Sequence, residues 1–311
     1  MIGSLSAVLV VGSINADVTA FASRAPQPGE TISGEAFELQ LGGKGANQAV
    51  AAARAGAVTH MVGCVGDDPF AGLATAALGA AGVEMAHVRT VPGHTGIAHI
   101  RVYEHGDNDI VVVPHANASI TPEQLERAFA ELRGSARVML TQLETPFETT
   151  LAAARLAHET GVTVILDPAP AAPLDDAIWP LVDIVKPNET EAGVLTGIRV
   201  HSRDTAVEAG RWFLAKGVRA ALITMGGAGS VLVTPQSVTE QPARRIDVVD
   251  TTAAGDAYAG HLAASIAAGV SIELAIGRAG AAGAIAVTRR GSSASIPTAA
   301  EVDELLASDG A

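Results

Sequence analysis

The segment VVDTTAAGDAYAG, residues 248–260, places a carboxylate at the start of a helical pattern. Two apolar residues end an extended run, small residues form a turn, and Asp256 stands where the alanine-rich pattern begins. A helix N-terminus carries unpaired N–H groups and about half a positive charge, and it therefore attracts phosphate. Taken alone, the segment predicts a capped helix with a spare acid beside a position suited to phosphate.

The glycine-rich segment LGGKGANQAV, residues 41–50, also runs into a helical pattern and holds one lysine. A P-loop needs a glycine five residues before the final Gly-Lys pair, and Ser or Thr after the lysine. Glu38 and Gly45 occupy those positions, so the segment is not a P-loop. Either its backbone approaches a ligand, with Lys44 and Asn47 as polar contacts, or it is a tight strand-to-helix turn with a solvated lysine.

Asn15 and Asp17 follow the first apolar run in VVGSINADV, residues 10–18. Ligands of open parallel sheets bind outside the carboxyl ends of the strands, so these two residues are candidates for binding hydroxyl groups. They can equally be turn residues, which Asn and Asp favour. No G-x-G-x-x-G follows the first strand, and its absence disfavours a nicotinamide-dependent oxidoreductase.

Two further segments could contribute to a nucleotide site. IVKPNETEAGVLTG, residues 184–197, predicts a helix with Asn188 as its N-cap and with Glu189 and Glu191 in its first turn. The acids suit the helix dipole; alternatively, Asn188 and Glu191 organise hydrated Mg²⁺ and nucleotide phosphates. LITMGGAGSVLV, residues 222–233, predicts strand, turn and strand, and its glycines either form a phosphate-binding nest or only turn a hairpin.

An α/β fold is expected to position these residues. From residue 137 onward, short apolar runs alternate with helical patterns near 146–160 and 203–216, which predicts βαβ units and a parallel sheet with helices on both faces. Thr121 is expected to cap a further helix, with Gln124 placed to close a capping box.

The first third of the chain differs from the rest. Residues 17–41 and 95–114 look extended, because apolar and polar residues alternate in both, and Gly106, Asp107 and Asn108 are expected to make a turn in the second segment. We therefore expect a small β-sheet, built from two separated insertions, that projects from the body as a lid.

The composition indicates an ordered globular protein and excludes several partners. The chain has 311 residues, 48% hydrophobic and 17% charged, and its formal net charge of −13 argues against nucleic acid or an anionic membrane bound through a broad basic face. Cys64 is the single cysteine and is expected to be a buried structural thiol, which suits a reducing cytosol. The N-terminus is interpreted as a first strand. No stretch reaches the ~20 uninterrupted apolar residues that a membrane helix needs. The nine histidines lack the spacing of zinc ligands.

Taken in order, seven motifs make the pattern specific. The motifs are GSINADV, GGKGANQAV, TQLETP, DPAPA, PNETEA, LITMGGAG and DTTAAGD. Together they resemble the ribokinase family, the phosphofructokinase-B-type sugar kinases, and the resemblance runs from about Ala7 to Pro297. The resemblance implies one domain over residues 1–311, with a three-layer α/β/α body around a parallel sheet and a β-sheet lid formed by about 15–42 and 95–115. Many members dimerise by clasping their lids together, so a homodimer is also implied.

The resemblance also implies roles for individual residues. Asp256 is the expected general base, and the anion hole for the transferred phosphoryl group is expected at Ala254 and Gly255, with Ala253 nearby. The residues expected to hold the sugar hydroxyls are Asn15, Asp17, Gly43, Lys44, Asn47 and Glu144. The residues expected to line the ATP site are Asn188, Thr224, Met225, Gly226, Gly227, Ala228, Gly229, Gly255 and Gly280. Asn188 with Glu191 is expected to serve Mg²⁺, and the expected ligands of a potassium ion are Asp250, Thr252, Ala286, Arg289, Gly291 and Ser295.

Two positions depart from the family pattern. Gly280 stands where related kinases often carry Asn or His beside the adenine, and Asp167 in DPAPA stands where close relatives commonly have Asn. The first change puts the contact with the adenine base in question, and the second is assigned no direct contact with substrate.

The leading hypothesis is ATP-dependent phosphorylation of ribose at its 5-hydroxyl. Deoxyribose, another small sugar or a nucleoside are the alternative acceptors, and the 3% aromatic content disfavours a nucleoside, whose base requires a larger apolar or aromatic pocket. A non-catalytic sugar-binding regulator is disfavoured, because an intact base and anion hole would then be idle.

Overall fold

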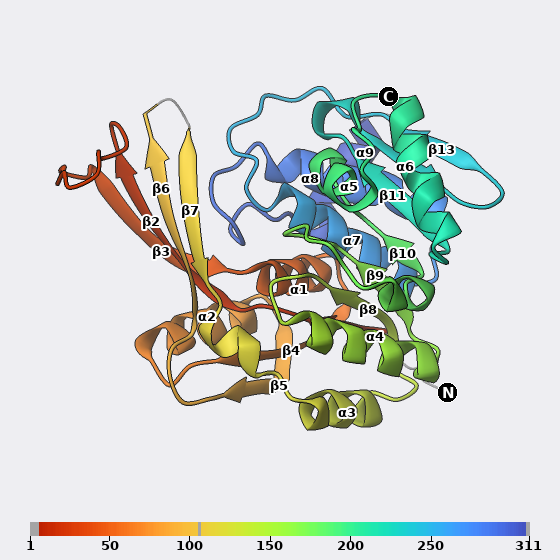
Figure 1. Ribbon diagram of the computed structural model, residues 1–311, viewed down its shortest axis with the longest axis horizontal. Coiled ribbons are helices and arrows are strands. Elements are labelled where there is room, and N and C mark those ends of the chain that lie inside the picture. The colour runs from red at the N-terminus through yellow and green to blue at the C-terminus, as the bar shows by residue number, and fades with distance from the viewer. Residues whose placement is uncertain (1–5, 105–106, 309–311) are drawn as a thin grey trace.

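The computed structural model describes residues 6–104 and 107–308, and within these residues the strands form two sheets (Figure 1). The strands of the large sheet are β1 (Ala7–Val11), β4 (Val58–Val65), β5 (Val83–Thr90), β8 (Ala136–Thr141), β9 (Thr163–Leu166), β10 (Ile184–Val185), β11 (Ala220–Thr224), β12 (Ser230–Val233) and β13 (Val238–Gln241). Their order is β13-β12-β11-β10-β9-β8-β1-β4-β5, and pairing is parallel except where β12 meets β11 and β13. The expected parallel sheet is confirmed, with an antiparallel hairpin at one edge.

Helices cover both faces of the large sheet. The helices packed on one face are α1 (Lys44–Arg54), α2 (Pro69–Ala80), α7 (Ala254–Ala267), α8 (Ile272–Ala286) and α9 (Ala299–Ser308). Those on the other face are α3 (Pro122–Glu131), α4 (Phe147–Thr160), α5 (Glu189–Thr196) and α6 (Arg203–Ala215). Val8 and Val10 of β1 join the first core while Leu9 and Val11 join the second, because successive side chains of a strand point to opposite faces. These three layers confirm the expected body.

The small sheet forms the lid. Its strands are β2 (Asn15–Ala22), β3 (Ala36–Gly42), β6 (Gly96–Tyr103) and β7 (Asn108–Val113), in the order β3-β2-β6-β7. β2 and β6 pair in parallel although they come from separate insertions, and Figure 1 shows the sheet projecting from the body. Of the three residues expected in the turn, Gly106 lies outside the described residues, whereas Asn108 is the first residue of β7, because its backbone pairs with Val102 of β6.

Helices α1 and α7 pack unusually closely, and Gly260 allows this contact. A Cβ built on Gly260 would lie 2.3 Å from Cβ of Ala51 and 2.7 Å from the backbone nitrogen of Ala52. A side chain at this position would therefore push the two helices apart. The same contact places the N-terminal turns of α1 and α7 side by side, and both turns contribute to the site described below.

One local prediction is wrong at Gln124. Thr121 caps α3 as expected, and its side chain accepts a hydrogen bond from the backbone N–H of Gln124. The Gln124 side chain, however, donates to the carbonyl oxygens of Gly63 and His87, each at 2.8 Å, and does not return to the cap. Buried carbonyls need donors, and satisfying two of them outweighs closing a capping box.

Cys64 is buried as predicted, and burial raises the pKa of its thiol. Across residues 6–104 and 107–308, no helix has the length and apolar character needed to cross a membrane.

Candidate active site

The carboxyl ends of several neighbouring strands meet at one edge of the large sheet. Ser13 follows β1, Gln142 follows β8, Asp167 follows β9 and Lys186 follows β10, and the sheet order places these strands side by side. Ligands of open parallel sheets bind at this edge. The structure therefore gathers polar residues that are far apart in the sequence.

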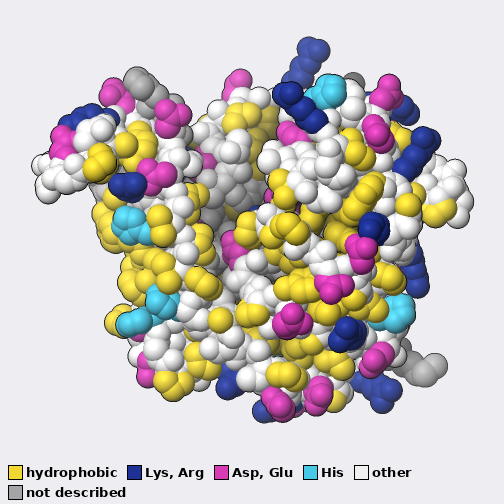
Figure 2. All heavy atoms as spheres, viewed as in Figure 1, with side chains coloured by type: hydrophobic (Ala, Val, Ile, Leu, Met, Phe, Trp, Pro, Cys, Tyr) yellow, Lys and Arg dark blue, Asp and Glu magenta, His cyan; other side chains and the backbone are white. Residues whose placement is uncertain are grey.

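The lid overhangs the same edge. Figure 2 shows the molecule hollowed between the lid and the body, and a cavity of ≈ 500 Å³ lies there. Asp17 and Gln40 line it from the lid, whereas Asp250, Thr252 and Ser292 line it from the body. Asp17 faces the cavity because Gln40 is its cross-strand partner, and paired residues point to the same side of a sheet.

Asp256 lies in the first turn of α7, as the sequence predicts. The chain enters this helix through Ala253, whose φ of 58° is left-handed, and the Asp256 side chain is buried. Its two carboxylate oxygens accept hydrogen bonds from Nδ2 of Asn47 at 3.2 Å and from Nε2 of Gln48 at 3.0 Å. Nζ of Lys44 lies 3.9 Å from Oδ1 of Asp256. The carboxylate is thus held in a fixed orientation by groups from α1.

The helix start also leaves donors for an anion. The first N–H groups of any α-helix have no intrahelical acceptor, so those of α7 are available beside Asp256. The N–H of Ala254 already makes a long bond of 3.3 Å to the carbonyl of Thr251. Of the two expected anion-hole amides, Gly255 is therefore the less engaged.

Glu144 fixes the start of the glycine-rich segment. Its Oε2 accepts from the hydroxyl of Ser13 at 2.6 Å and from the backbone N–H of Lys44 at 2.9 Å. Gly43 adopts φ = 84°, a left-handed conformation that favours glycine. The Ser13 hydroxyl in turn accepts from the backbone N–H of Gly45 at 3.2 Å. This turn is thus held by side chains that follow β1 and β8.

Lys44 keeps its charge at this site. Burial lowers the pKa of its ammonium group, but the carboxylates of Asp256, Asp167, Glu144 and Glu191 raise it by more, so the net pKa is above its ordinary value. Lys44 therefore places a positive charge beside the Asp256 carboxylate.

Asn15 and Asp17 lie in the buried part of the lid. Oδ1 of Asn15 accepts from Nδ2 of Asn117 at 2.6 Å, and Oδ1 of Asn117 accepts from the backbone N–H of Ile14 at 2.8 Å. Asp17 has its pKa raised to about 7 by burial, then by the charges of Glu144 and Asp256, against the opposing effect of the Ser292 hydroxyl. Asp17 therefore changes charge near neutral pH.

Asn188 and Glu191 form the predicted helix cap. Oδ1 of Asn188 accepts from the backbone N–H of Glu191, and Oε2 of Glu191 accepts from the backbone N–H of Asn188, both at 2.8 Å. Burial and the nearby Asp167 raise the pKa of Glu191, whereas the Asn188 N–H, Lys186 and Lys44 lower it by less. Within residues 6–104 and 107–308, no group of three or more His, Cys, Asp and Glu could by itself hold a metal. This donor set fits Mg²⁺ held largely through water and phosphate oxygens.

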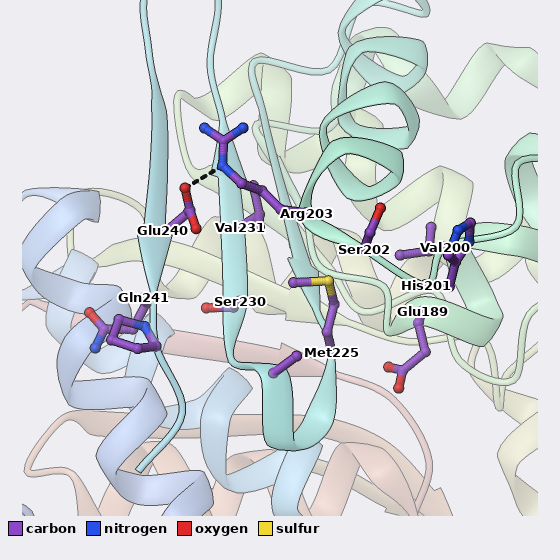
Figure 3. A pocket seen from close by; sticks show the side chains of 12 residues that line it. Glu189, Val200, His201, Ser202, Arg203, Met225, Ser230, Val231, Glu240 and Gln241 are labelled. Atoms are coloured by element: carbon purple, nitrogen blue, oxygen red, sulfur yellow. Dashed lines mark hydrogen bonds and ion pairs between the residues drawn. The ribbon is translucent and has the colours of Figure 1, made fainter.

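The glycine turn after β11 borders a second cavity of ≈ 480 Å³. Figure 3 shows Met225 beside this cavity, with Ser202 and Glu189 on one side and the Arg203–Glu240 ion pair above. The turn itself contains the short helix η3 (Gly226–Ala228), with left-handed glycines at 226 and 229.

Gly280 lies near the same cavity. A Cβ at Gly280 would be 3.8 Å from Cγ of Gln241, which lines the cavity, and 3.9 Å from Nη1 of Arg244. The structure therefore places Gly280 against the end of β13, where a larger side chain would reach neighbours at ordinary contact distance.

The two loops expected to bind potassium lie against each other. Oδ2 of Asp250 accepts from the backbone N–H of Gly291 at 3.0 Å, and Oδ1 accepts from the hydroxyl of Thr252 at 2.6 Å. Burial raises the pKa of Asp250, but these hydrogen bonds and Arg290 lower it by more. Arg289 pairs through its side chain with Glu301, and Ser295 is buried. The Asp250 carboxylate and the Thr252 hydroxyl bring oxygen ligands together, and oxygen ligands suit a monovalent cation.

Several residues of this site received no role from the sequence. The set comprises Ser13, Gln48, Asn117, Gln142 and Lys186. Gln48 and Lys186 lie inside segments that already pointed to a site, but neither the type nor the spacing of these two residues singled them out. Asn117 carries no comparable signal, because it reaches Asn15 from the short helix η1 (His115–Ser119).

Comparison with known proteins gives a consistent set of relatives. The profile of the pfkB family carbohydrate kinases matches residues 6–299. A ribokinase of Haemophilus influenzae is 38% identical over 298 residues, covering 96% of this chain and 97% of its own length. A deoxyribokinase of Salmonella typhi is 35% identical over 301 residues, covering 96% and 98%.

Solved structures agree with the fold. A ribokinase of Arabidopsis thaliana, complexed with ribose and ATP, superposes with a TM-score of 0.90 at 33% identity and covers 97% of this chain and 98% of its own. A ribokinase of Thermotoga maritima gives a TM-score of 0.89 at 33% identity, covering 97% and 99%.

Proposed function

The chain belongs to the pfkB family of carbohydrate kinases, and on this basis we propose that it transfers the γ-phosphoryl group of ATP to the 5-hydroxyl of ribose, giving ribose 5-phosphate and ADP. The observation that carries this proposal is the Asp256 carboxylate, which lies in the first turn of α7 and is held on its two oxygens by Asn47 and Gln48. One site thus combines a base, N–H donors for phosphate and hydrogen-bonding groups for a polyol.

In this proposal Asp256 accepts the proton of the sugar hydroxyl as its oxygen attacks the γ-phosphorus. The new O–P bond forms, the bond between the γ-phosphorus and the bridging oxygen breaks, and ADP leaves. Phosphoryl transfer relies on positioning and charge stabilisation, so the N–H groups of Gly255 and Ala254, in the turn entered through Ala253, stabilise the equatorial oxygens. Lys44 adds positive charge on the sugar side.

The sugar is held by the residues around this base. Oxygens and amides that can bind several hydroxyl groups converge between the lid and the body, on Asn15, Asp17, Gly43, Lys44, Asn47 and Glu144. Asn47 is informative, because its Oδ1 is buried without a hydrogen-bond partner in the described structure, while its Nδ2 donates to Asp256. A sugar hydroxyl would satisfy that oxygen.

We assign the nucleotide to the neighbouring strand ends. The residues concerned are those of the turn from Thr224 to Gly229, with Asn188, Gly255 and Gly280. Mg²⁺ bound with ATP would neutralise phosphate charge, and Asn188 and Glu191 would hold it through water. A potassium ion would be held by the loops of Asp250, Thr252, Ala286, Arg289, Gly291 and Ser295, which support the turn before α7. We also assign the chain to the cytoplasm, working as a single domain.

An ADP-release assay tests the proposed function. Wild-type protein is mixed with Mg²⁺ and ATP over a panel of ribose, 2-deoxyribose, other pentoses, hexoses and nucleosides, each in potassium and in sodium. We expect ribose to give the highest kcat/KM and potassium to give the higher rate. A higher kcat/KM for deoxyribose would favour the activity of the deoxyribokinase relatives, and release from no sugar would favour a sugar-binding regulator.

The raised pKa of Asp17 makes ribose binding depend on pH. Below about 7 the carboxyl is protonated, and above it the carboxylate is a stronger acceptor for a sugar hydroxyl. We expect the ribose KM to fall roughly fivefold as the pH rises from one unit below to one unit above that pKa. Initial rates at saturating ATP measure this, and Asp17→Asn should flatten the profile. An unchanged profile in that variant would assign the dependence to another group.

The outward face of the lid favours a homodimer. Phe37 and Leu39 on β3 and Val111 and Val113 on β7 are exposed, and cross-strand pairing places Leu39 and Val111 on the face opposite Asp17. Light scattering is expected to give twice the mass of one chain, because burying this apolar face is favourable. Leu39→Glu with Val111→Glu is expected to give one chain mass, and a monomeric wild type would reject the dimer.

A further inference from the structure

Lys186 and Asp167 form a buried ion pair that the proposed reaction does not use. Nζ of Lys186 lies 2.9 Å from Oδ1 of Asp167, and each side chain is only 3% exposed. Removing two charges from water costs free energy that can exceed their attraction, so a buried ion pair need not stabilise the fold. Its position at the ends of β9 and β10, inside the site, calls for another explanation.

The ammonium group of Lys186 lies beside the anion hole. A Cβ built on Gly255 would be 3.9 Å from Nζ of Lys186. The amide of Gly255 belongs to the first turn of α7, where the proposed transfer places phosphate oxygens. An ammonium group has three N–H donors, and Asp167 takes one of them. The others are therefore available to the same phosphate group.

Asp167 is itself fixed on both oxygens. Its Oδ1 faces Lys186, and its Oδ2 accepts from Nε2 of Gln48 at 2.6 Å. The same Nε2 donates to Oδ1 of Asp256 at 3.0 Å, while Gln142 donates to Oε1 of Gln48. This network links Lys186 through Asp167 and Gln48 to the proposed base.

The site also carries several negative charges. The carboxylates of Asp167, Asp256, Glu144 and Glu191 all act on Lys44, and ATP adds further negative charge. Lys44 lies on the Asp256 side, whereas Lys186 lies on the Gly255 side. Each lysine therefore lies beside a different residue of the first turn of α7.

We propose that Lys186 binds the phosphate chain of ATP at the anion hole and that Asp167 is a positioning residue that holds Lys186 there. The proposal rests on the chain being an ATP-dependent kinase, and it holds whichever sugar is the acceptor. Because a lysine contact to phosphate is charge-assisted, its loss is expected to lower kcat/KM for ATP about 10- to 100-fold.

The test compares three variants with the wild type. Lys186→Met is expected to lower kcat/KM for ATP as stated and to change the ribose KM less than about twofold. It leaves Asp167 without its cation and can destabilise the fold, so Asp167→Asn/Lys186→Met, which removes both charges, is measured with it. Lys216→Met is the matched control, because it breaks an exposed pair with Asp176. Both residues precede strands, on the side of the sheet opposite the site. Binding of a nonhydrolysable ATP analogue with Mg²⁺, followed by thermal shift, gives a readout independent of turnover.

Equal loss of ATP recognition in the single and double variants supports the proposal. Asp167→Asn alone retains Lys186, so its kcat/KM for ATP is expected to fall less than that of Lys186→Met or of the double variant. Recovery of wild-type ATP parameters in the double variant would overturn it, because the pair would then serve only to cancel buried charge. A wild type that phosphorylates no sugar would refute the proposed function instead, and the thermal shifts would still decide the role of Lys186.

Discussion

Asp256→Asn is expected to lower kcat by about 10²- to 10⁴-fold, the contribution of a general base, with little effect on the fold. The amide oxygen of asparagine can still accept one of the two hydrogen bonds that Asn47 and Gln48 donate, so the site keeps much of its packing. What the variant loses is the acceptor for the sugar's proton. Steady-state turnover of ribose with ATP measures the loss, and ribose binding and thermal unfolding check that the fold is intact.

Asp183→Asn is the matched control for this prediction. Asp183 precedes β10, at the amino end of the strand and therefore at the edge of the sheet opposite the site. Its carboxylate accepts from the backbone N–H of Val164 at 2.7 Å and pairs with Arg219 at 2.9 Å. The same chemical change there should leave kcat within about twofold, because it touches no reacting group. Near-wild-type turnover in Asp256→Asn would remove Asp256 from the role of base.

Much of the body and the lid could be predicted because their signals are local. Apolar runs of strand length that alternate with helical patterns predict parallel βαβ units, and alternation in the two insertions predicts the lid. The segments ending in Asn15, Asn188 and Asp256 pointed to the site for the same reason: each follows a strand or starts a helix, and the carboxyl ends of parallel strands share one edge.

The contacts within the site were not predictable in the same way. Gln48 is one residue from Asn47, yet only the crossing of α1 with α7 shows that both reach Asp256. Asn117 lies about a hundred residues from its partner Asn15, and nothing in its own segment indicates that contact. Gln124 shows the converse, since its sequence position favours a cap while buried carbonyls elsewhere attract its side chain. Long-range hydrogen bonds depend on packing, which local patterns do not encode.

The same dependence on packing makes Gly260 a sensitive position. Gly260→Ala is expected to lower the free energy of unfolding by about 1–3 kcal/mol, because the new methyl group would overlap Cβ of Ala51 and the backbone of Ala52. Relief requires α1 to move away from α7, and Asn47 and Gln48 would move with it. We therefore expect kcat to fall together with stability, since the Asp256 carboxylate loses its two donors.

Gly72→Ala is the control that isolates the steric effect. Gly72 lies in α2, is exposed, and a Cβ there would meet nothing within 4 Å. In a helix, Ala is favoured over Gly by roughly 0.5–1 kcal/mol, so this variant should be more stable than the wild type. Urea unfolding of both variants, followed by the fluorescence of Trp179 and Trp212, measures the two shifts. If close packing of α1 and α7 positions the base, the free energy of unfolding must fall in Gly260→Ala and rise in Gly72→Ala. An equal rise in both variants would show that α1 and α7 can separate at no cost.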